Sequence, residues 1–357
     1  MEKIIIDFLY KNNNFAGPKA REDVKRIAKE HGFTPFLINT STVKDQTKRH
    51  PSPIYRFFYR IRKLIIILSA ICHIKRGSMV LLQYPFNLFN GFYLRMFCRS
   101  MRTKKCHLVL LVHDISHFRC HEVFGQTEIK ILNSASELIV HTPQMMDLFR
   151  KNGIVTPCRL LWIFDYLTEE VPNNNHNGNG PTCIAFAGYL EKSLFLKKLT
   201  DISLDGIEMH LYGNDPHDSF VFPSWMKYIG RFDPENVTML TEKWGLAWDG
   251  DSIETIQGPL GNYLRYNSSH KISLYIAAGI PVIVSEESAL AGFVKENKLG
   301  ITVSSLLELD KRIAQLENTE YQLIRDNVAK VSATLREGRQ LGAILDDIVK
   351  DVEEIQS

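Results

Sequence analysis

Short apolar segments alternate with amphipathic segments along almost the whole chain, and this alternation constrains the fold more than any other feature. Between the first two apolar segments, residues 19–31 carry apolar side chains at helical spacing, and Gly32 follows as a stop signal. Strands that alternate with helices are typical of stacked βα units, whose strands form a parallel sheet. The strands expected in the first half are 4–9, 35–39, 79–84, 108–113 and 137–141.

The alternation breaks once, at residues 171–181, where five Asn and two Gly occupy the eight positions 173–180. Such a segment contributes nothing to a core and is expected as a linker or long surface loop. The pattern then restarts, with strands expected at 183–188, 208–212, 245–249, 281–284 and 301–303. A chain of 357 residues is long enough for two cores. We therefore predict an α/β protein with two doubly wound, Rossmann-like domains, 1–170 and 182–330, and a C-terminal helix, 331–357, that packs across both.

Composition excludes several classes of protein. The formal net charge is only +3, so the molecule as a whole is not a general polyanion binder. The six cysteines contain no CxxC pair and no zinc-type spacing with histidine, which favours a reducing compartment. The N-terminal apolar run is interrupted by Asp7 and predicts a strand, not a secretion signal. The apolar run 64–74 is too short to span a bilayer. We expect a cytoplasmic protein.

Two doubly wound domains that face each other imply a ligand cleft at the carboxyl ends of their strands. In segment 263–284, Ser268 or Ser269 is expected to cap a helix that ends at Gly279, before a strand. His270 and Lys271 then lie in its first turn, where free N–H groups and the helix dipole favour an anion. A lysine there suits a diphosphate, although an exposed lysine on an ordinary helix explains the same residue.

The segment His270-Lys-Ile-Ser-Leu-Tyr-Ile-Ala-Ala-Gly-Ile-Pro-Val-Ile-Val284 resembles the nucleotide-sugar-binding segment of GT-B glycosyltransferases. More specifically, it resembles the bacterial galactofuranosyltransferase-like family, which includes β-1,6-galactofuranosyltransferases and related glucosyltransferases. Segments 245–252, 258–267 and 111–115 are similar to the same family and occur in the expected order. The resemblance implies a GT-B fold with an acceptor domain first and a nucleotide-sugar donor domain second.

By this resemblance, Lys271, His270 and Asn267 would contact the donor diphosphate, and Asp249 would line the cleft near the sugar or ribose. Asp249-Gly-Asp251 also has the spacing of a metal-binding DxD motif. GT-B enzymes, however, stabilise the leaving diphosphate with basic side chains and helix N-termini. We therefore expect no metal and no cofactor, and we interpret Asp251 as a turn residue.

Three further donor-binding residues are expected after strands of the second half. Gly188 ends one strand and lets a ligand approach the backbone, and Lys192 follows in the same loop. Lys192 is equally explained as an exposed lysine at a helix start. Glu287, with Glu286 beside it, follows the strand 281–284, where related enzymes hold the ribose with a carboxylate. Helix capping also explains these glutamates.

In the first half, His113 and Asp114 come at the end of the strand 108–113. An inverting glycosyl transfer needs a base for the acceptor hydroxyl, and Asp114 is the candidate, with His113 as its neighbour or an acceptor ligand. Asp114 as a cap of the following loop is the alternative. Asn14 to Gly17, after the first strand, form a turn expected to admit the acceptor. It lacks the GxGxxG fingerprint of a dinucleotide site.

One stretch has an unusual charge pattern. Residues 46–113 contain no Asp or Glu but thirteen Lys and Arg, with aromatic residues interleaved around 55–59. A basic, aromatic, amphipathic surface fits anionic lipids and a lipid-diphosphate acceptor. The alternatives are a nucleic-acid patch or core aromatics beside exposed arginines. We favour membrane contact through residues 48–76.

The function expected is transfer of a hexosyl group, with galactofuranosyl among the candidates, from a UDP-sugar to a lipid-linked or oligosaccharide acceptor. The setting implied is bacterial surface polysaccharide synthesis, including capsule, on the inner face of the cell membrane. No nucleic-acid partner is expected, and the oligomeric state stays open, a homo-oligomer included. The rivals are a non-catalytic nucleotide-sugar-binding subunit, an enzyme that epimerises or hydrolyses nucleotide sugars, and a nucleic-acid-binding protein.

Overall fold

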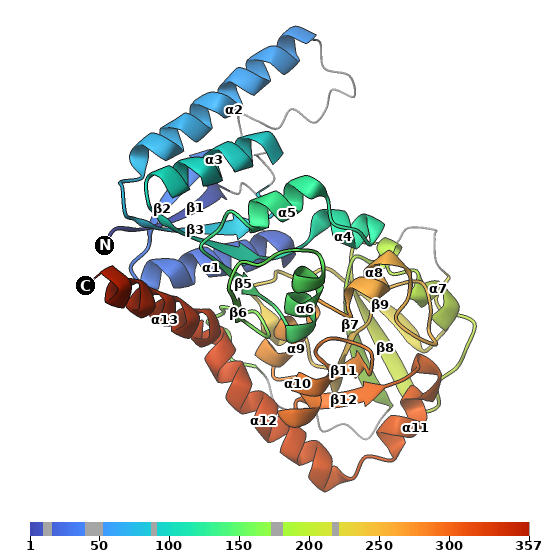
Figure 1. Cartoon of the computed structure of the whole chain (residues 1–357). Helices are drawn as coiled ribbons and strands as arrows, with labels where there is room; N and C mark the ends of the chain where they lie inside the picture. Colours follow the sequence, from blue (N-terminus) through green and yellow to red (C-terminus); the bar gives the residue numbers. More distant parts are fainter. Residues whose placement is uncertain (10–15, 40–52, 87–90, 173–180, 216–220, 357) are drawn as a thin grey trace. The chain divides into compact units, whose positions relative to one another are not determined.

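The computed structural model describes residues 1–9, 16–39, 53–86, 91–172, 181–215 and 221–356, and the chain divides into two compact units. The first unit contains Met1–Val140, Met145–Leu161 and Leu341–Ser357. The second unit contains His141–Gln144 and Trp162–Gln340. Each unit holds one six-stranded sheet with helices around it (Figure 1). The predicted α/β class is confirmed.

The first sheet has the strand order β2-β1-β3-β4-β5-β6, and all its pairings are parallel. The strands are β1 (Lys3–Leu9), β2 (Thr34–Asn39), β3 (Met79–Tyr84), β4 (His107–Val112), β5 (Glu137–Val140) and β6 (Cys158–Leu160). The helices are α1 (Ala16–Glu30), α2 (Pro53–His73), α3 (Gly91–Thr103), α4 (Ser116–His121), α5 (Gln126–Leu132), α6 (Pro143–Lys151) and α13 (Arg339–Gln356). The order reverses after β2, so right-handed crossovers place α1 on one face of the sheet and α2, α3 and α5 on the other (Figure 1).

The second sheet has the order β12-β11-β10-β7-β8-β9 and is also parallel. Its strands are β7 (Thr182–Gly188), β8 (Ile207–Gly213), β9 (Met226–Gly230), β10 (Trp244–Ala247), β11 (Val282–Ser285) and β12 (Gly300–Val303). Its helices are α7 (Phe195–Leu199), α8 (Gly258–Tyr263), α9 (His270–Ala277), α10 (Ala291–Glu296), α11 (Leu309–Ala314) and α12 (Asn318–Arg336), with the short 3₁₀ turns η1 (Leu190–Lys192), η3 (Val237–Met239) and η4 (Leu306–Glu308). Chain order along the sheet reverses between β7 and β10, which makes their carboxyl ends its topological switch point.

The central strands were predicted because both of their faces are covered. Every residue of β3 and β10 is buried, so each strand shows as a continuous apolar run. Two strands were missed, β6 and β9, and both lie at an edge of their sheet. β6 has only three residues, and β9 leaves Tyr228 39% and Ile229 46% exposed. An edge strand with little burial gives little hydrophobic pattern in the sequence.

The C-terminal segment is helical, as its polar pattern predicted, but it forms two helices where a single helix, 331–357, was expected. The break falls at Gly338, which has φ +75°. α12 packs on α9 inside the second unit, where the Ser332 hydroxyl donates a 2.9 Å hydrogen bond to the Ala277 carbonyl. Most of α13 belongs to the first unit, where Asp351 pairs with Arg159 at 2.5 Å. Among the helices built from described residues, none combines the length and apolarity needed to cross a membrane.

Candidate functional site

The candidate donor site is built at the switch point of the second sheet, around Lys271. The α9 N-cap is Ser269, whose side chain accepts a hydrogen bond from the Lys271 N–H, as predicted. The Lys271 ammonium lies 2.7 Å from a carboxylate oxygen of Asp249, which follows β10. It also lies 5.3 Å from the centre of the Phe186 ring on β7. The side chain of Lys271 therefore reaches the ends of both strands that form the switch point.

Gly188, the last residue of β7, leaves room for this lysine. A Cβ at position 188 would lie 3.1 Å from Lys271 Cε, tighter than ordinary van der Waals contact. Gly188 is half-buried and paired in register with Gly213 at the end of β8. Two neighbouring strands thus end in glycine, which opens backbone N–H and C=O groups to a ligand.

The loop after Asp249 is fixed by a second glycine. Gly250 has φ +107°, and a Cβ there would lie 2.1 Å from the Gln257 carbonyl oxygen. Its own carbonyl accepts a 3.1 Å hydrogen bond from the Phe195 N–H. Asp251 is bonded through its backbone N–H to the Gln257 carbonyl at 3.3 Å, in keeping with a turn residue. The loop geometry holds the Asp249 carboxylate against Lys271.

His270 and Asn267 flank the N-terminus of α9. The His270 ring packs on Phe164, with ring centres 4.4 Å apart. Burial, with a smaller contribution from His141, lowers the pKa of His270 to about 3, so its imidazole is neutral at pH 7. Asn267 has a buried Oδ1 that accepts no hydrogen bond from the described residues, and such an atom is a candidate ligand contact.

The remaining donor candidates lie on separate loops. Glu287 follows β11 and forms a 2.9 Å ion pair with Arg265, and the Thr255 hydroxyl also donates to it. These two partners lower the pKa of Glu287, so it is ionised at neutral pH. Glu286 turns the other way, toward Lys295 at 3.5 Å. Lys192 ends η1, with its ammonium 4.8 Å from the Tyr189 ring centre.

In the first unit, His113 and Asp114 directly follow β4. His113 Nε2 lies 2.6 Å from the Gln83 side-chain oxygen on the neighbouring strand β3. Asp114 forms a 2.5 Å ion pair with Arg119 of α4. Any base chemistry by Asp114 therefore takes place beside a guanidinium. Asn14 lies outside the described residues, and Gly17 lies in the first turn of α1, so the helix begins earlier than the predicted turn allowed.

Comparison with known proteins matches both halves of the chain to the two domains of one family. Residues 2–162 match the model of the glucosyltransferase 3-like N-terminal domain, and residues 184–348 match that of the glucosyltransferase 3-like C-terminal domain. A glucosyltransferase 3 of Streptococcus parasanguinis is 30% identical over 76% of this chain and 78% of its own length. The chain belongs to the glucosyltransferase 3-like family. It is a glycosyltransferase.

Sequence similarity to a second relative covers nearly the whole of this glycosyltransferase. The beta-1,6-galactofuranosyltransferase WbbI of Escherichia coli K12 is 27% identical over 94% of this chain and 95% of its own length. Among solved structures, a sucrose-phosphate synthase from Thermosynechococcus elongatus aligns with TM-score 0.65, 12% identity and coverage of 99% and 100%. That likeness concerns the fold and, together with the presence of two six-stranded parallel sheets, confirms the predicted GT-B class.

Three contributors to these sites in this glycosyltransferase were not predicted. Phe186 contacts Lys271 from β7, and Arg265, which lies inside segment 258–267 but was not singled out there, pairs with Glu287. Glu128 of α5 is 7% exposed and accepts a 3.1 Å hydrogen bond from the Tyr84 hydroxyl at the end of β3. Burial raises the pKa of Glu128. A lone glutamate on a short helix gives no sequence signal for such a position.

Proposed function

We propose that this glycosyltransferase moves a hexosyl group from a UDP-sugar to a lipid-linked glycan in bacterial surface polysaccharide synthesis. The observation that carries the proposal is the position of Lys271, at the N-terminus of α9 and at the switch point of the second sheet. A cation beside free helix N–H groups is suited to a diphosphate. The comparisons support glycosyl transfer, and the geometry supports a nucleotide diphosphate as the leaving group.

In this proposal, the donor diphosphate replaces Asp249 as the partner of Lys271. The ion pair keeps the lysine oriented before the donor binds, and the lysine then neutralises the charge that develops on the leaving phosphate. Asp249, released from the lysine, faces the sugar or the ribose. The neutral His270 and the Asn267 amide contribute hydrogen bonds to phosphate oxygens. This arrangement supplies the electrostatic stabilisation without a metal ion.

Two loops complete the proposed nucleotide contacts. Glu287, ionised and oriented by Arg265, accepts hydrogen bonds from the ribose hydroxyls. Gly188 admits the phosphates close to the backbone, and Lys192, in the same loop, adds a second cation. The relatives supply the candidates for the sugar: one is named a galactofuranosyltransferase and another a glucosyltransferase. We place UDP-galactofuranose first and UDP-glucose second.

The acceptor is proposed to bind the first unit, with Asp114 as the base of an inverting transfer and His113 as a neighbour that orients the acceptor hydroxyl. Both side chains follow β4 and are held by hydrogen-bonding partners, Arg119 and Gln83. A base must lie within hydrogen-bond reach of the hydroxyl that it deprotonates. Asp114 meets this requirement if the acceptor enters at the carboxyl end of β4.

Membrane contact is proposed for α2, because its outer face is apolar. Ile54, Phe57, Phe58 and Ile65 are each 60–69% exposed, at helical spacing on one face. The opposite side packs on the first unit, where the Tyr93 hydroxyl of α3 donates to a carbonyl of α2. Exposed apolar side chains on an amphipathic basic helix are typical of interfacial helices. The protein is then peripheral on the cytoplasmic face of the membrane.

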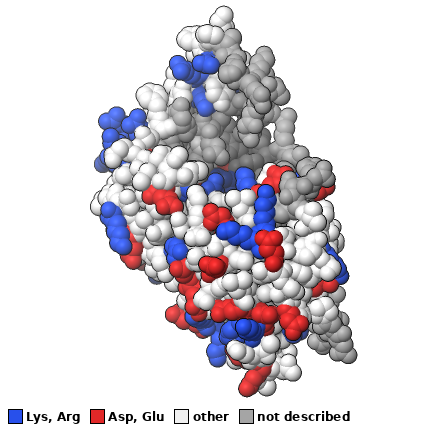
Figure 2. Space-filling model, turned by 90° about the vertical axis from the view of Figure 1, so that its right-hand side faces the viewer, with Lys and Arg blue, Asp and Glu red and all other residues white. Residues whose placement is uncertain are grey.

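A basic hollow between α3 and α5 supports an anionic membrane surface. It has a volume of about 720 Å³ and is lined by α3, α5 and the segment that follows α5. Its charged lining residues are all basic: Arg95, Arg99, Arg102 and Lys130. In the view of Figure 2, only Lys and Arg are coloured at the top of the molecule, whereas Lys and Arg are interspersed with Asp and Glu over its lower part. The local charge fits phosphate headgroups better than it fits binding of long nucleic acids.

The reaction is tested by incubating the full-length protein with UDP-galactofuranose, UDP-galactopyranose, UDP-glucose or GDP-mannose, with and without a lipid-linked glycan acceptor. We expect UDP release and a lengthened glycan only when both substrates are present. Donor consumption without acceptor indicates the rival hydrolase or epimerase. Donor binding without any product indicates a non-catalytic subunit.

The membrane proposal is tested by flotation with phosphatidylglycerol and phosphatidylcholine vesicles. We expect salt-sensitive binding to the anionic vesicles, lost in Phe57→Ser/Phe58→Ser. The matched control is Val123→Ser/Val155→Ser, which removes two exposed apolar side chains elsewhere in the first unit. Equal loss in both variants, or no flotation of the native protein, contradicts a role for α2. Binding to DNA or RNA in place of vesicles would favour the nucleic-acid alternative.

A further inference from the structure

A cysteine, a glutamate and a histidine meet on neighbouring strands of the second sheet, away from the donor site. Cys183 of β7 is paired in register with Glu208 of β8, and His210 lies two residues further along β8. Residues two apart on a strand share a face, so Glu208 and His210 project together. The Cys183 sulfur, one Glu208 oxygen and one His210 nitrogen all lie within 4.8 Å of one another.

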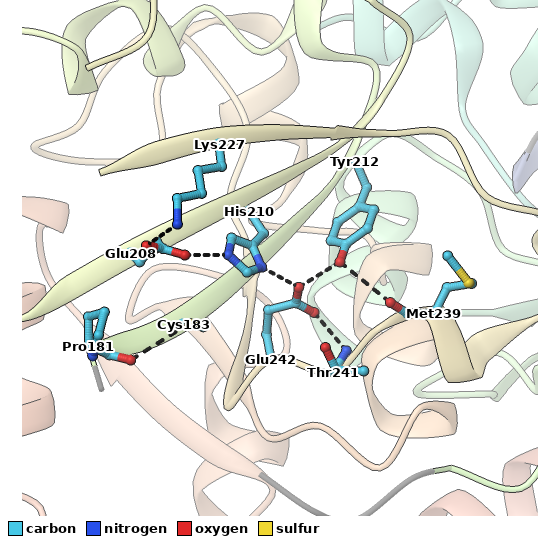
Figure 3. Close-up of polar contacts among 9 residues, drawn as sticks. All are labelled: Pro181, Cys183, Glu208, His210, Tyr212, Lys227, Met239, Thr241 and Glu242. Carbon is cyan, nitrogen blue, oxygen red and sulfur yellow. Dashed lines mark hydrogen bonds and ion pairs between the residues drawn. The ribbon is translucent and has the colours of Figure 1, made fainter. Parts of the chain in front are cut away.

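A second layer of hydrogen bonds fixes the histidine ring (Figure 3). His210 Nδ1 donates to Glu242 Oε1 at 2.7 Å. Glu242 is 2% exposed and also accepts from the Tyr212 hydroxyl at 2.6 Å and from the Thr241 N–H at 3.0 Å. A carboxylate on one ring nitrogen sets the tautomer and the orientation, and it leaves the other nitrogen for a metal.

The other nitrogen, His210 Nε2, points at Glu208. It lies 2.7 Å from Glu208 Oε1, and a proton bridges the two atoms. The second oxygen of Glu208 is paired with the Lys227 ammonium of β9 at 2.6 Å. The hydrogen bond with His210 and the ion pair with Lys227 therefore occupy the carboxylate. A divalent ion of suitable size would replace both.

We propose that Cys183, Glu208 and His210 form a Zn²⁺ site, with water as a fourth ligand. A thiolate, an imidazole and a carboxylate are the ligands that zinc binds in tetrahedral geometry, at about 2.0–2.3 Å. On binding, the thiol loses its proton, His210 Nε2 loses the bridging proton, and Lys227 moves away from Glu208. Glu242 stays on His210 Nδ1 as the outer-shell partner. No step of sugar transfer passes through this ion.

The site lies at the opposite end of the strands from Lys271. Cys183 and Glu208 are the second residues of their strands, whereas Gly188 and Gly213 are the last. The metal joins β7 to β8. The cluster also includes the segment before β10, because the Lys243 N–H donates to the Cys183 carbonyl at 3.0 Å, next to Glu242. Zinc is therefore expected to stabilise the second unit and to leave donor chemistry unchanged.

The test is metal titration of the full-length, metal-free protein with Zn²⁺ and with Co²⁺ as a spectroscopic probe. We expect one equivalent of Co²⁺ to give a thiolate-to-metal absorption band that Zn²⁺ removes, and Zn²⁺ to raise the melting temperature. Cys183→Ser should lose the band and the thermal shift. Cys72→Ser, which changes an exposed cysteine of the first unit, should keep both.

The variant Lys227→Ala distinguishes a metal site from a cluster whose ion pairs serve only to stabilise the fold. Removing the competing ammonium should tighten metal binding severalfold if Glu208 is a ligand. Glu242→Gln should weaken binding by about 10–100-fold, the usual effect of an outer-shell change. Absence of metal binding at micromolar Zn²⁺, an unchanged cobalt band in Cys183→Ser, or weaker binding in Lys227→Ala would each overturn the proposal.

Discussion

The strand ends of the two units differ in how their polar side chains are held. In the second unit, Lys271 contacts Asp249, 22 positions away in sequence, and Phe186, on a different strand. In the first unit, Asp114 pairs with Arg119, only five positions away. The second-unit arrangement exists only when the sheet is folded, whereas the first-unit pair is local. His113 in the first unit is nevertheless held by Gln83, 30 positions away, so only the Asp114 contact is local there. We infer that the second unit presents a preformed site, and that the position of Asp114 depends more on what binds.

The largest effect on turnover is expected for a substitution of Asp114. It tests whether this residue acts as the catalytic base or only pairs with Arg119. Asp114→Asn should lower kcat by about 10²–10⁴-fold, the usual contribution of a general base, with donor binding unchanged. Steady-state kinetics and donor calorimetry measure the two quantities separately. Glu128→Gln is the matched comparison, since Glu128 is a buried carboxylate bonded to the Tyr84 hydroxyl at the end of β3, and burial raises its pKa. If only Glu128→Gln abolishes turnover, the base has been assigned to the wrong residue.

The next effect tests whether the second-unit loop is preformed by its backbone. Gly250 has φ +107°, and a Cβ would meet a backbone oxygen at 2.1 Å, so Gly250→Ala forces the loop to move. We expect about 1–3 kcal/mol less stability of the second unit, the cost of a non-glycine residue in this region, and weaker UDP binding. Gly153→Ala is a control in the first unit, with φ +77° but no atom within 4 Å of the added Cβ. Equal UDP binding in native protein and Gly250→Ala would argue against a preformed loop.

A smaller effect concerns the pH dependence of the second unit. The pKa of His270 is about 3 in the folded protein because of burial and His141, whereas an unfolded histidine titrates near 6.5. Between these values the unfolded chain binds one more proton, so stability falls as pH falls. The slope is about 1.4 kcal/mol per pH unit. Urea unfolding at several pH values measures it.

The matched variants are His270→Gln, which should remove this part of the slope, and His121→Gln, an exposed histidine of the first unit, which should not. The comparison of slopes isolates one histidine from the other titrating groups. Identical slopes in native protein and His270→Gln would show that folding does not lower the pKa of His270.

Much of the fold was predictable from the sequence, because central strands such as β3 and β10 are buried along their whole length and leave unbroken apolar runs. The edge strands β6 and β9 were not predictable, because their partial exposure leaves no unbroken apolar run in the sequence. Local chemistry limited the helix cap to Ser268 or Ser269, and the structure has Ser269 in that position. Asp249 was expected in the donor site, but its ion pair with Lys271, like that of Glu287 with Arg265, joins residues 22 positions apart, so only the folded sheet reveals the pairing. The cluster of Cys183, Glu208 and His210 was even less predictable from the sequence, because the register of β7 and β8, and not spacing along the chain, brings the three residues together.

The central claim is that Lys271 holds a donor diphosphate, and calorimetry with UDP tests it most directly. Native protein, Lys271→Ala and Lys330→Ala, an exposed lysine of α12, are titrated under the same conditions. We predict that UDP binds the native protein and Lys330→Ala equally, and that Lys271→Ala loses about 1.5–3 kcal/mol of binding free energy, the value of a hydrogen bond to a charged group. Unchanged UDP affinity in Lys271→Ala would contradict the claim and place the nucleotide elsewhere.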